Sequence, residues 1–342
     1  MHSLITSVTS ILLLFLLLLS SNNSYKTMSI FKKQKVSNVL ASPSSLSYSE
    51  ETVKLCSWNI DGIRDENLES DSIKEMRIAI ISSILLAEKP DVICIQENTI
   101  PMYSIIQSSL DNHYEDIEGG PKAGYFTSIF IKRDKKYKVS HQRINFAGLA
   151  KSEMQRDLNI ATIELQNTKR LMLMTSHLES LANFEKARRN QLQIALEILI
   201  DSGCDYALLC GDLNIREKEA KDVMNAVNNL YILPGKGKSA VCDAWIKCGE
   251  NFNTKFTWTG KPFGLPHQKA RYDRIYYVNK EGITPSEFRL IGTDTVEDIT
   301  TTSCKDQLEP SDHFGVLCTF KFSNNPSNDS IVRKPVDPFL TP

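Results

Sequence analysis

The chain has 342 residues, enough for one large domain or two ordinary ones with a buried core. Its formal net charge of −1 excludes a surface that attracts nucleic acid by overall positive charge, so an anionic ligand must be held by local clusters. Cys94, Cys210 and Cys318 lie inside apolar runs and no C-x-x-C pair occurs. The cysteines therefore indicate buried thiols in a reducing compartment rather than disulfides.

The two ends of the chain differ in composition from its middle. Residues 4–19 are almost entirely apolar, which predicts a signal-peptide core or a short membrane anchor, although a start at Met28 would remove them. Residues 20–50 and the C-terminal end are Ser- and Asn-rich and predict flexible segments. We therefore expect a hydrophobic segment with a linker over residues 1–50, one globular domain over 51–322 and a disordered tail over 323–342.

Short apolar runs alternate with helical patterns throughout the expected domain. The first run, residues 53–60, predicts a buried strand whose successive side chains face opposite sides. The next segment, residues 72–90, predicts a helix that stops before its final proline. Its apolar residues recur at helical spacing, and they are Ile73, Met76, Ile80 and Ile84.

The remainder of the domain predicts further strands and a second long helix. The strands are expected at residues 91–97, 127–132, 159–165, 170–178, 206–212, 271–278 and 314–322. The helix is expected at residues 183–200, with a buried side formed by Leu192, Ala195, Leu196 and Leu199. This mixture of strands, short joins and helices indicates an α/β sandwich with mixed sheets.

Polar side chains close these apolar strands. They are Asn59, Asp61, Glu97, His177, Asp212, Asn214, Asp273, Asp312 and His313. Burying such groups is costly unless a partner satisfies them. If the strands lie side by side, their ends converge on one rim and build a polar site over an apolar floor.

Each of these residues also has a structural interpretation. Asp61-Gly62 and the segment after Asp212 are compatible with ordinary turns. His177 is compatible with a hydrogen-bonded core histidine, Asp273 with an ion pair, and His313 with a helix cap. The site interpretation fails only if all of these alternatives hold together.

The ordered strings WNID, QE, SHLES, GDLN, YDRI and SDHFG resemble the endonuclease/exonuclease/phosphatase superfamily, which has the DNase I-like fold. The fuller strings SWNIDGI, AGYFTSIF, MTSHLES, GDLNIRE and PSDHFGVLC resemble its 5′-tyrosyl-DNA phosphodiesterase family over residues 53–322. The resemblance implies an α/β four-layer sandwich, with two central mixed β-sheets flanked by helices. Vertebrate members carry an N-terminal ubiquitin-associated domain that this sequence does not show, so ubiquitin-linked recruitment is not expected.

The residue types suit metal-assisted cleavage of a phosphodiester. Asp61 and Glu97 are oxygen donors suited to Mg²⁺, with Mn²⁺ as a possible substitute. Asp212 is the expected general base for water, held by Asn59 and Asn214.

The remaining polar residues are expected to act on the phosphate or on its neighbours. His313 and His177 are expected to donate hydrogen bonds to the non-bridging phosphate oxygens. Asp273 is expected to orient His313, and Asp312 to support the waters of the metal.

The resemblance also implies a groove for single-stranded DNA. Its expected aromatic residues are Tyr125, Trp258 and Tyr272, and its expected local positive charges are Arg156, Arg216 and Arg271. The resemblance carries over these further residues as contacts to the 5′ nucleotide and phosphate: Asn59, Ile60, Asp61, Gly62, Ile63, His177, Leu178, Glu179, Ser180, Asn214 and Ile215.

Two features of the next segment bear on that groove. Leu181 and Ala182 stand where the family usually shows Thr-Arg, which puts one phosphate contact in doubt. Arg188 and Arg189 follow Glu185 on the expected helix and predict a solvated, charged face.

The predicted function is Mg²⁺-dependent hydrolysis of 5′-phosphotyrosyl bonds between DNA ends and trapped topoisomerase II, in double-strand break repair. Expected partners are 5′-tyrosyl single-stranded DNA ends, a topoisomerase II-derived peptide and possibly protein-linked RNA, with the chain as a monomer. Other branches stay open, namely an abasic-site endonuclease, a deadenylase or an inositol or lipid phosphatase, as does a non-catalytic DNA-binding scaffold. The family suggests nucleus and cytoplasm, whereas the N-terminal segment leaves membrane anchoring or secretion open.

Overall fold

The structure, a computed structural model, describes residues 51–63, 70–118, 124–150, 152–231, 240–260, 267–293 and 309–323. The expected hydrophobic segment and linker over 1–50, and the tail after residue 323, lie outside the described residues. Within the described ranges, no helix has both the length and the apolar character needed to cross a membrane.

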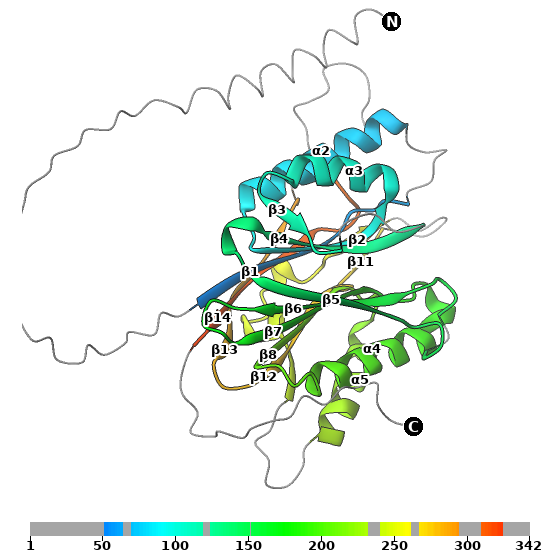
Figure 1. Cartoon of the computed structure of the whole chain (residues 1–342). Helices are drawn as coiled ribbons and strands as arrows, with labels where there is room; N and C mark the ends of the chain where they lie inside the picture. The colour runs from blue at the N-terminus through cyan, green and yellow to red at the C-terminus, as the bar shows by residue number, and fades with distance from the viewer. Residues whose placement is uncertain are drawn as a thin grey trace, which may run out of the picture. The chain divides into compact units, whose positions relative to one another are not determined.

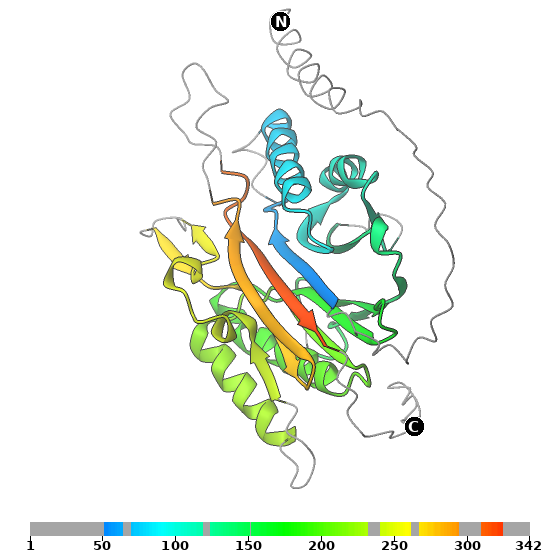
Figure 2. The same cartoon turned by 90° about the vertical axis from the view of Figure 1, so that its left-hand side faces the viewer.

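The first of two six-stranded sheets contains the N- and C-terminal strands of the domain. Its order is β13-β14-β1-β2-β4-β3. The strands are β1 (Glu51–Asn59), β2 (Val92–Thr99), β3 (Tyr114–Asp116), β4 (Tyr125–Lys132), β13 (Ile283–Ile291) and β14 (Gly315–Phe322). β1 and β2 are parallel and the other pairs are antiparallel. Figure 2 shows β14 lying between β13 and β1, which brings the two ends of the domain together.

The second sheet has the order β5-β6-β7-β8-β12-β9. Its strands are β5 (Lys138–Asn145), β6 (Asp157–Glu164), β7 (Arg170–His177), β8 (Tyr206–Asp212), β9 (Ala240–Asp243) and β12 (Asp273–Asn279). β7 and β8 form its parallel pair. A small separate hairpin pairs β10 (Trp258–Gly260) with β11 (Gln268–Ala270). Both large sheets are therefore mixed, as the sequence predicts.

Helices flank the pair of sheets. α2 (Asp71–Glu88) and α3 (Ile100–Leu110) lie on one side, and α4 (Glu185–Ile200) and α5 (Glu217–Tyr231) lie on the other (Figure 1). The short helix α6 (Ala244–Lys247) follows β9. In both sheets the parallel pair is connected through a helix, because parallel neighbours need a long crossover.

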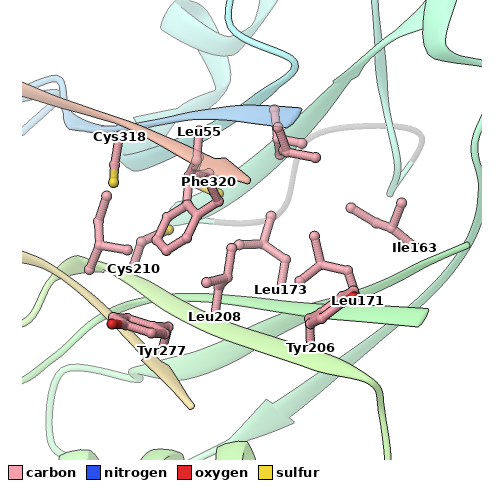
Figure 3. Close-up of a cluster of buried hydrophobic side chains, with 14 of the residues drawn as sticks. Leu55, Ile163, Leu171, Leu173, Tyr206, Leu208, Cys210, Tyr277, Cys318 and Phe320 are labelled. Carbon is pink, nitrogen blue, oxygen red and sulfur yellow. The ribbon is translucent and has the colours of Figure 1, made fainter. Parts of the chain in front are cut away.

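Three buried apolar clusters hold these layers together. The central cluster lies between the sheets, where Leu55 and Phe320 of the first sheet face Leu173 and Leu208 of the second (Figure 3). One outer cluster joins the first sheet to α2 and α3, and the other joins the second sheet to α4 and α5. The inner strands thus carry apolar residues on both faces, and most of their polar residues lie near their ends.

Strand β1 shows this two-sided burial directly. Leu55 belongs to the cluster between the sheets, whereas Cys56, Trp58 and Ile60 belong to the cluster beneath α2 and α3. The predicted alternation of faces is confirmed. Cys94, Cys210 and Cys318 are buried free thiols, as predicted.

Both predicted helices are found at the expected positions, but the buried face of α2 differs from the predicted one. The buried side of α4 contains the four predicted residues, Leu192, Ala195, Leu196 and Leu199. In α2, however, Ile73 and Met76 are 39% and 37% exposed, and the buried stripe is Arg77, Ile78, Ile81, Ser82 and Leu85. The stripe includes an arginine because carbonyl groups of neighbouring loops accept its hydrogen bonds.

Candidate active site

Three adjacent strands of the second sheet end in aligned polar residues. His177 of β7 lies opposite Asp212 of β8, and Asp212 lies opposite Asp273 of β12. Residues paired in this way project from the same face of a sheet. The strand order, which is not the chain order, therefore sets these three side chains in one row.

The first sheet supplies the facing side of the site through Asn59 and Glu97. The fully buried Asn59 donates from Nδ2 to Asp212 Oδ2 at 2.9 Å and to Glu97 Oε1 at 3.0 Å. One amide group thus links two carboxylates from different sheets. The predicted convergence of strand ends is observed.

The backbone near Asp61 and Glu97 is unusual. Both residues have positive φ angles, 50° and 56°, in a region that costs energy for side chains other than glycine. A Cβ on the intervening Gly62 would lie 1.9 Å from the carbonyl oxygen of Glu97, so only glycine allows the two segments to approach this closely. The surrounding fold therefore holds the backbone of Asp61 and Glu97 in these strained conformations.

His313 is held by a buried carboxylate. Its Nδ1 lies 2.8 Å from Asp273 Oδ2, and its Nε2 lies 3.6 Å from Asp212 Oδ2. Burial alone would lower the pKa of His313, but Asp273 and Asp212 together raise it well above its usual value. The imidazole is therefore a protonated, positively charged donor.

The position of His313 is reinforced through its backbone. The buried indole of Trp58 donates to the His313 carbonyl at 3.0 Å, and the His313 N–H donates to Ser311 Oγ at 3.1 Å. Ser311 Oγ in turn donates to the carbonyl of Asn59 at 2.8 Å. The strand carrying Asn59 and the loop carrying His313 are thus fixed to each other.

His177 occupies the opposite electrostatic environment. Arg156 Nη1 lies 3.0 Å from its Nδ1, and its Nε2 lies 3.3 Å from Asp212 Oδ2. Burial and the positive charge of Arg156 lower the pKa of His177 well below its usual value. Because the guanidinium can only donate, Nδ1 must accept, and the single proton of the neutral ring lies on Nε2.

The central carboxylates repel one another, and His313 offsets only part of this repulsion. Burial raises the pKa of Glu97 to about 7, and Asp61 and Asp212 add repulsion. Burial and Asp273 raise the pKa of Asp212 to about 6. A divalent cation beside Glu97 would relieve this repulsion, so the residues present fit such an ion.

Among the residues that the structure describes, two groups of acidic and histidine side chains are close enough to hold a metal. One is Glu97 with His177 and Asp212, and the other is Asp212 with Asp273 and His313. Both histidine Nε2 atoms carry protons in the arrangement described above, so neither offers a lone pair. The available donors are carboxylate oxygens, which suit hard cations.

The expected supports of Asp212 are partly in place. The Asn214 N–H donates to Asp212 Oδ1 at 3.0 Å, and its side-chain amide donates to the carbonyl of Leu178 at 3.1 Å. Asp312 accepts from the indole of Trp258 at 2.8 Å and lies 4.0 Å from His313 Nε2. Asp312 is thus linked to an aromatic residue of the predicted groove.

Two aromatic pairs flank the centre. The guanidinium carbon of Arg156 lies 4.9 Å from the ring centroid of Tyr125, whose ring meets His177 edge-on at 6.0 Å. On the other side, the rings of Trp258 and Tyr272 lie 5.5 Å apart. The structure therefore places the three predicted aromatic residues near the row formed by His177, Asp212 and Asp273.

Several predicted DNA contacts are corrected by burial. Ile60, Leu178 and Ile215 are fully buried members of the outer apolar clusters, so their side chains cannot contact DNA. The buried Glu179 instead accepts hydrogen bonds from Ser152 Oγ and from two backbone N–H groups of the following residues. Ile63 and Arg216 remain exposed to solvent.

Arg271 is a further correction. Its buried guanidinium donates to Asp243 Oδ2 at 2.8 Å and to Glu217 Oε1 at 2.7 Å, and it lies over the ring of Trp245. Beside it, Arg274 pairs with the same two carboxylates. Arg271 thus belongs to an internal ion-pair network, because its charge is already matched inside the protein.

Supporting residues escaped the sequence analysis. The buried Thr257 Oγ1 accepts from the N–H groups of Tyr272 and Asp273 at 3.1 and 3.0 Å. Arg77 donates to the carbonyls of Asp61 and Pro310 at 3.0 and 2.7 Å. The sequence offered a signal for a buried Arg77, because this arginine stands beside apolar residues of a predicted helix. It offered no comparable signal for Thr257.

Comparisons with known proteins agree with this geometry. A sequence profile of the endonuclease/exonuclease/phosphatase family matches residues 56–313. The chain belongs to this family. Its relatives include tyrosyl-DNA phosphodiesterase 2 from Homo sapiens, 30% identical over 290 residues that cover 80% of this chain and 72% of that protein. The Danio rerio protein of the same name is 30% identical over 279 residues, with 79% and 67% covered.

Solved structures place the chain in the same family. Danio rerio tyrosyl-DNA phosphodiesterase 2 complexed with a single-strand DNA product has a TM-score of 0.61 at 28% identity, covering 79% of this chain and 98% of that one. A Bacteroides thetaiotaomicron family protein, 17% identical and covering 81% and 100%, shares the fold with a TM-score of 0.61. The predicted family membership, the DNase I-like fold and the hydrolase class are confirmed. Enzymes of this family use divalent metal ions.

Proposed function

We propose that this protein is a Mg²⁺-dependent 5′-tyrosyl-DNA phosphodiesterase. The observation that carries the proposal is the buried Asp212, which lies between His313 and His177 and is linked by Asn59 to Glu97. The names of the relatives and the single-strand DNA product bound to the Danio rerio protein support the choice of substrate.

In the proposed reaction, Asp212 takes a proton from the attacking water. The water oxygen bonds to phosphorus while the bond from phosphorus to the tyrosine oxygen breaks, and its electron pair leaves with the phenolate. A pKa of about 6 keeps Asp212 ionised at neutral pH yet basic enough to accept the proton. The products are a 5′-phosphate on DNA and a tyrosine side chain on the released peptide.

The two histidines complete the electrostatic arrangement. His313 donates a charged hydrogen bond to a non-bridging phosphate oxygen, and Asp273 stabilises that charge from behind. His177 donates a neutral hydrogen bond through Nε2, in the tautomer set by Arg156. A charged donor of this type contributes roughly 3–4 kcal/mol when negative charge builds on the phosphate, and a neutral donor about half as much or less.

Glu97 and Asp61 are the residues that would hold the metal, with Mn²⁺ as a possible substitute for Mg²⁺. The bound ion would act as a Lewis acid on the phosphate. Trp258 and Tyr272 would stack on bases, where each contact is worth about 1–3 kcal/mol. The strand that they accept is single, because a duplex would hide the faces of its bases.

The wider setting follows from the reaction. A topoisomerase II peptide left on a 5′ DNA end presents the tyrosyl ester that this site would cleave, and tyrosyl-linked RNA is a second substrate of the same chemistry. We propose a monomer that works in nucleus and cytoplasm. Fluorescent fusions of the full chain and of the chain begun at Met28 test the location, and secretion or membrane retention of both would overturn it.

The deciding experiment uses the purified full chain and a 5′-tyrosyl single-stranded oligonucleotide, with Mg²⁺ or with EDTA. We expect metal-dependent release of tyrosine and a 5′-phosphate product, with Asp212→Asn as the inactive control. Abasic duplex, poly(A) and phosphoinositide are assayed in parallel. Turnover of one of these, without tyrosine release, would assign the protein to another branch of the family.

A further inference from the structure

A fully buried arginine lies next to the segment that leaves the catalytic strand β7. Arg188 of α4 is 1% exposed, and the Nε and Nη2 edge of its guanidinium donates to both carboxylate oxygens of Glu219 of α5, at 2.8 and 2.7 Å. The sequence predicted a solvated face here, which is correct for the neighbouring Arg189 and wrong for Arg188. A paired arginine at this depth needs a reason, because desolvation offsets much of the attraction between the charges.

The third contact of Arg188 supplies that reason. Its Nη1 donates to the backbone carbonyl of Leu181 at 2.5 Å. Leu181 has φ 63° and ψ 160°, a conformation that is essentially restricted to glycine. Its side chain is nevertheless 63% exposed and packs into no core. The ion pair of Arg188 and Glu219 therefore holds the strained backbone of Leu181, and with it the exposed leucine side chain, in place.

Glu219 reaches the second flank of the same region. Its carboxylate accepts from the backbone N–H of Arg216 at 3.2 Å and lies 3.4 Å from the Arg216 guanidinium. Burial alone would raise the pKa of Glu219, but Arg188 and Arg216 lower it, so the carboxylate stays ionised. One buried carboxylate therefore organises both the segment after His177 and the segment after Asp212.

These two segments lie next to each other at the site. The Asn214 side chain donates to the carbonyl of Leu178, and Ser180 Oγ lies 3.3 Å from the sulfur of Met154, close to Arg156. Leu181 and Arg216 thus stand on one wall beside the catalytic row. The wall offers an apolar side chain and a half-exposed cation, which suit a nucleotide and its phosphate.

We propose that Arg188 and Glu219 are positioning residues for the substrate, and that they hold Leu181 and Arg216 as one wall of the groove for single-stranded DNA. The inference rests on the proposed function, because it takes a tyrosyl-linked strand as the substrate. Arg188 and Glu219 themselves contact no substrate and act through the two segments that they hold.

A double-mutant cycle in the full chain tests this. Leu181→Gly removes the side chain but accepts the backbone conformation, so we expect an unfolding midpoint at or above that of the wild type. KM for a 5′-tyrosyl oligonucleotide should rise about fivefold, with kcat within about twofold, because an apolar contact to the ground-state strand is lost.

The informative comparison is Arg188→Lys, which keeps the charge but loses the planar fork. Alone it should raise KM about tenfold, whereas in the Leu181→Gly background it should raise KM only about twofold, since the glycine needs no support. Arg189→Lys, at the adjacent half-buried arginine that pairs with Glu185 and Asp222, is the matched control and should change nothing. Bis(p-nitrophenyl) phosphate, which contains no nucleotide to contact the wall, is the second substrate and reports on the catalytic centre alone.

The outcomes separate the two proposals. If the wild type releases no tyrosine, the proposed function fails. If it does, but the two substitutions act additively or lower kcat equally on both substrates, Arg188 has only a structural role and this inference fails. If Arg188→Lys does not fold, the Leu181→Gly result decides alone: an unchanged KM or a lowered unfolding midpoint overturns the inference.

Discussion

A histidine lies on each side of Asp212, and the two are equally buried but differ in charge: His313 is positively charged and His177 is neutral. His313 and His177 are 6% and 5% exposed, and each turns its Nε2 toward Asp212. The partner on Nδ1 differs, a carboxylate for His313 and a guanidinium for His177. Burial lowers the pKa of both rings; the carboxylate behind His313 helps to reverse that effect, whereas the guanidinium behind His177 adds to it and fixes the tautomer.

The two histidines are therefore expected to have different roles. His313 can offset negative charge that builds on the phosphate, whereas His177 can orient one oxygen without adding charge. A second positive charge beside Asp212 would lower the pKa of its carboxyl group and make it a weaker base. The contrast leads to four predictions, of which the loss of the central base should have the greatest effect.

Asp212→Asn removes the group that both sides face. We expect kcat to fall by about 10³-fold or more, because the amide cannot accept the proton from water. Binding of single-stranded DNA should change little, since Asn keeps the size and most hydrogen bonds. Turnover is followed by tyrosine release and binding by fluorescence anisotropy, and an equal loss of both would contradict the base role.

His313→Gln and His177→Gln compare the two donors directly. We expect kcat to fall about 10²–10³-fold for His313 and about tenfold for His177, because a hydrogen bond from a charged donor is roughly twice as strong. Single-turnover rates at saturating substrate give the comparison. Equal losses would show that charge does not distinguish the two sides.

Asp273→Asn and Arg156→Gln remove the partner behind each ring. Without Asp273 the pKa of His313 should fall, so the alkaline limb of the pH–rate profile moves to lower pH. Without Arg156 the pKa of His177 should rise toward its usual value, and its tautomer becomes free. NMR titration of the two imidazoles measures both pKa shifts. Shifts of the same sign would contradict the conclusion that the two partners act on their histidines in opposite directions.

The weakest of the four effects concerns stability. The folded-state pKa of Glu97 is raised from 4.5 to about 7, so the metal-free protein should lose stability as pH rises from about 4.5 to about 7, where the unfolded chain has released this proton and the folded protein still holds it. Mg²⁺ should raise the unfolding midpoint by a few degrees above the folded-state pKa and less below it. Glu97→Gln should stabilise the metal-free protein and abolish the Mg²⁺ response, as calorimetry can show.

Much of the fold was predictable because the inner strands are apolar on both faces. Continuous runs such as residues 206–212 allow few other interpretations, and β2, β4, β6, β7, β8, β12 and β14 all fall where they were expected. The strands that were missed are β3, β5, β9, β10, β11 and β13. These are short or lie at a sheet edge or in the small hairpin, where half-exposed residues give a weak pattern.

The candidate site divides in a similar way. The polar residues at the strand ends were visible in the sequence because each of them closes or follows an apolar run. Buried side chains within the same segments, such as Leu178 and Ile215, were mistaken for contacts because linear adjacency does not reveal which face a residue takes. Arg271 and Arg188 were misjudged for a related reason, since their carboxylate partners are distant in sequence.

The family, the α/β class and the polar residues of the centre are encoded in local pattern and in ordered motifs, so the amino-acid sequence was enough to predict them. The tertiary structure was needed to establish which sheet carries each residue, that Asn59 bridges Glu97 and Asp212, and which histidine is charged. Strand order and the partner behind each ring arise from packing between distant segments. Electrostatic state depends on distance in space, which the chain order does not record.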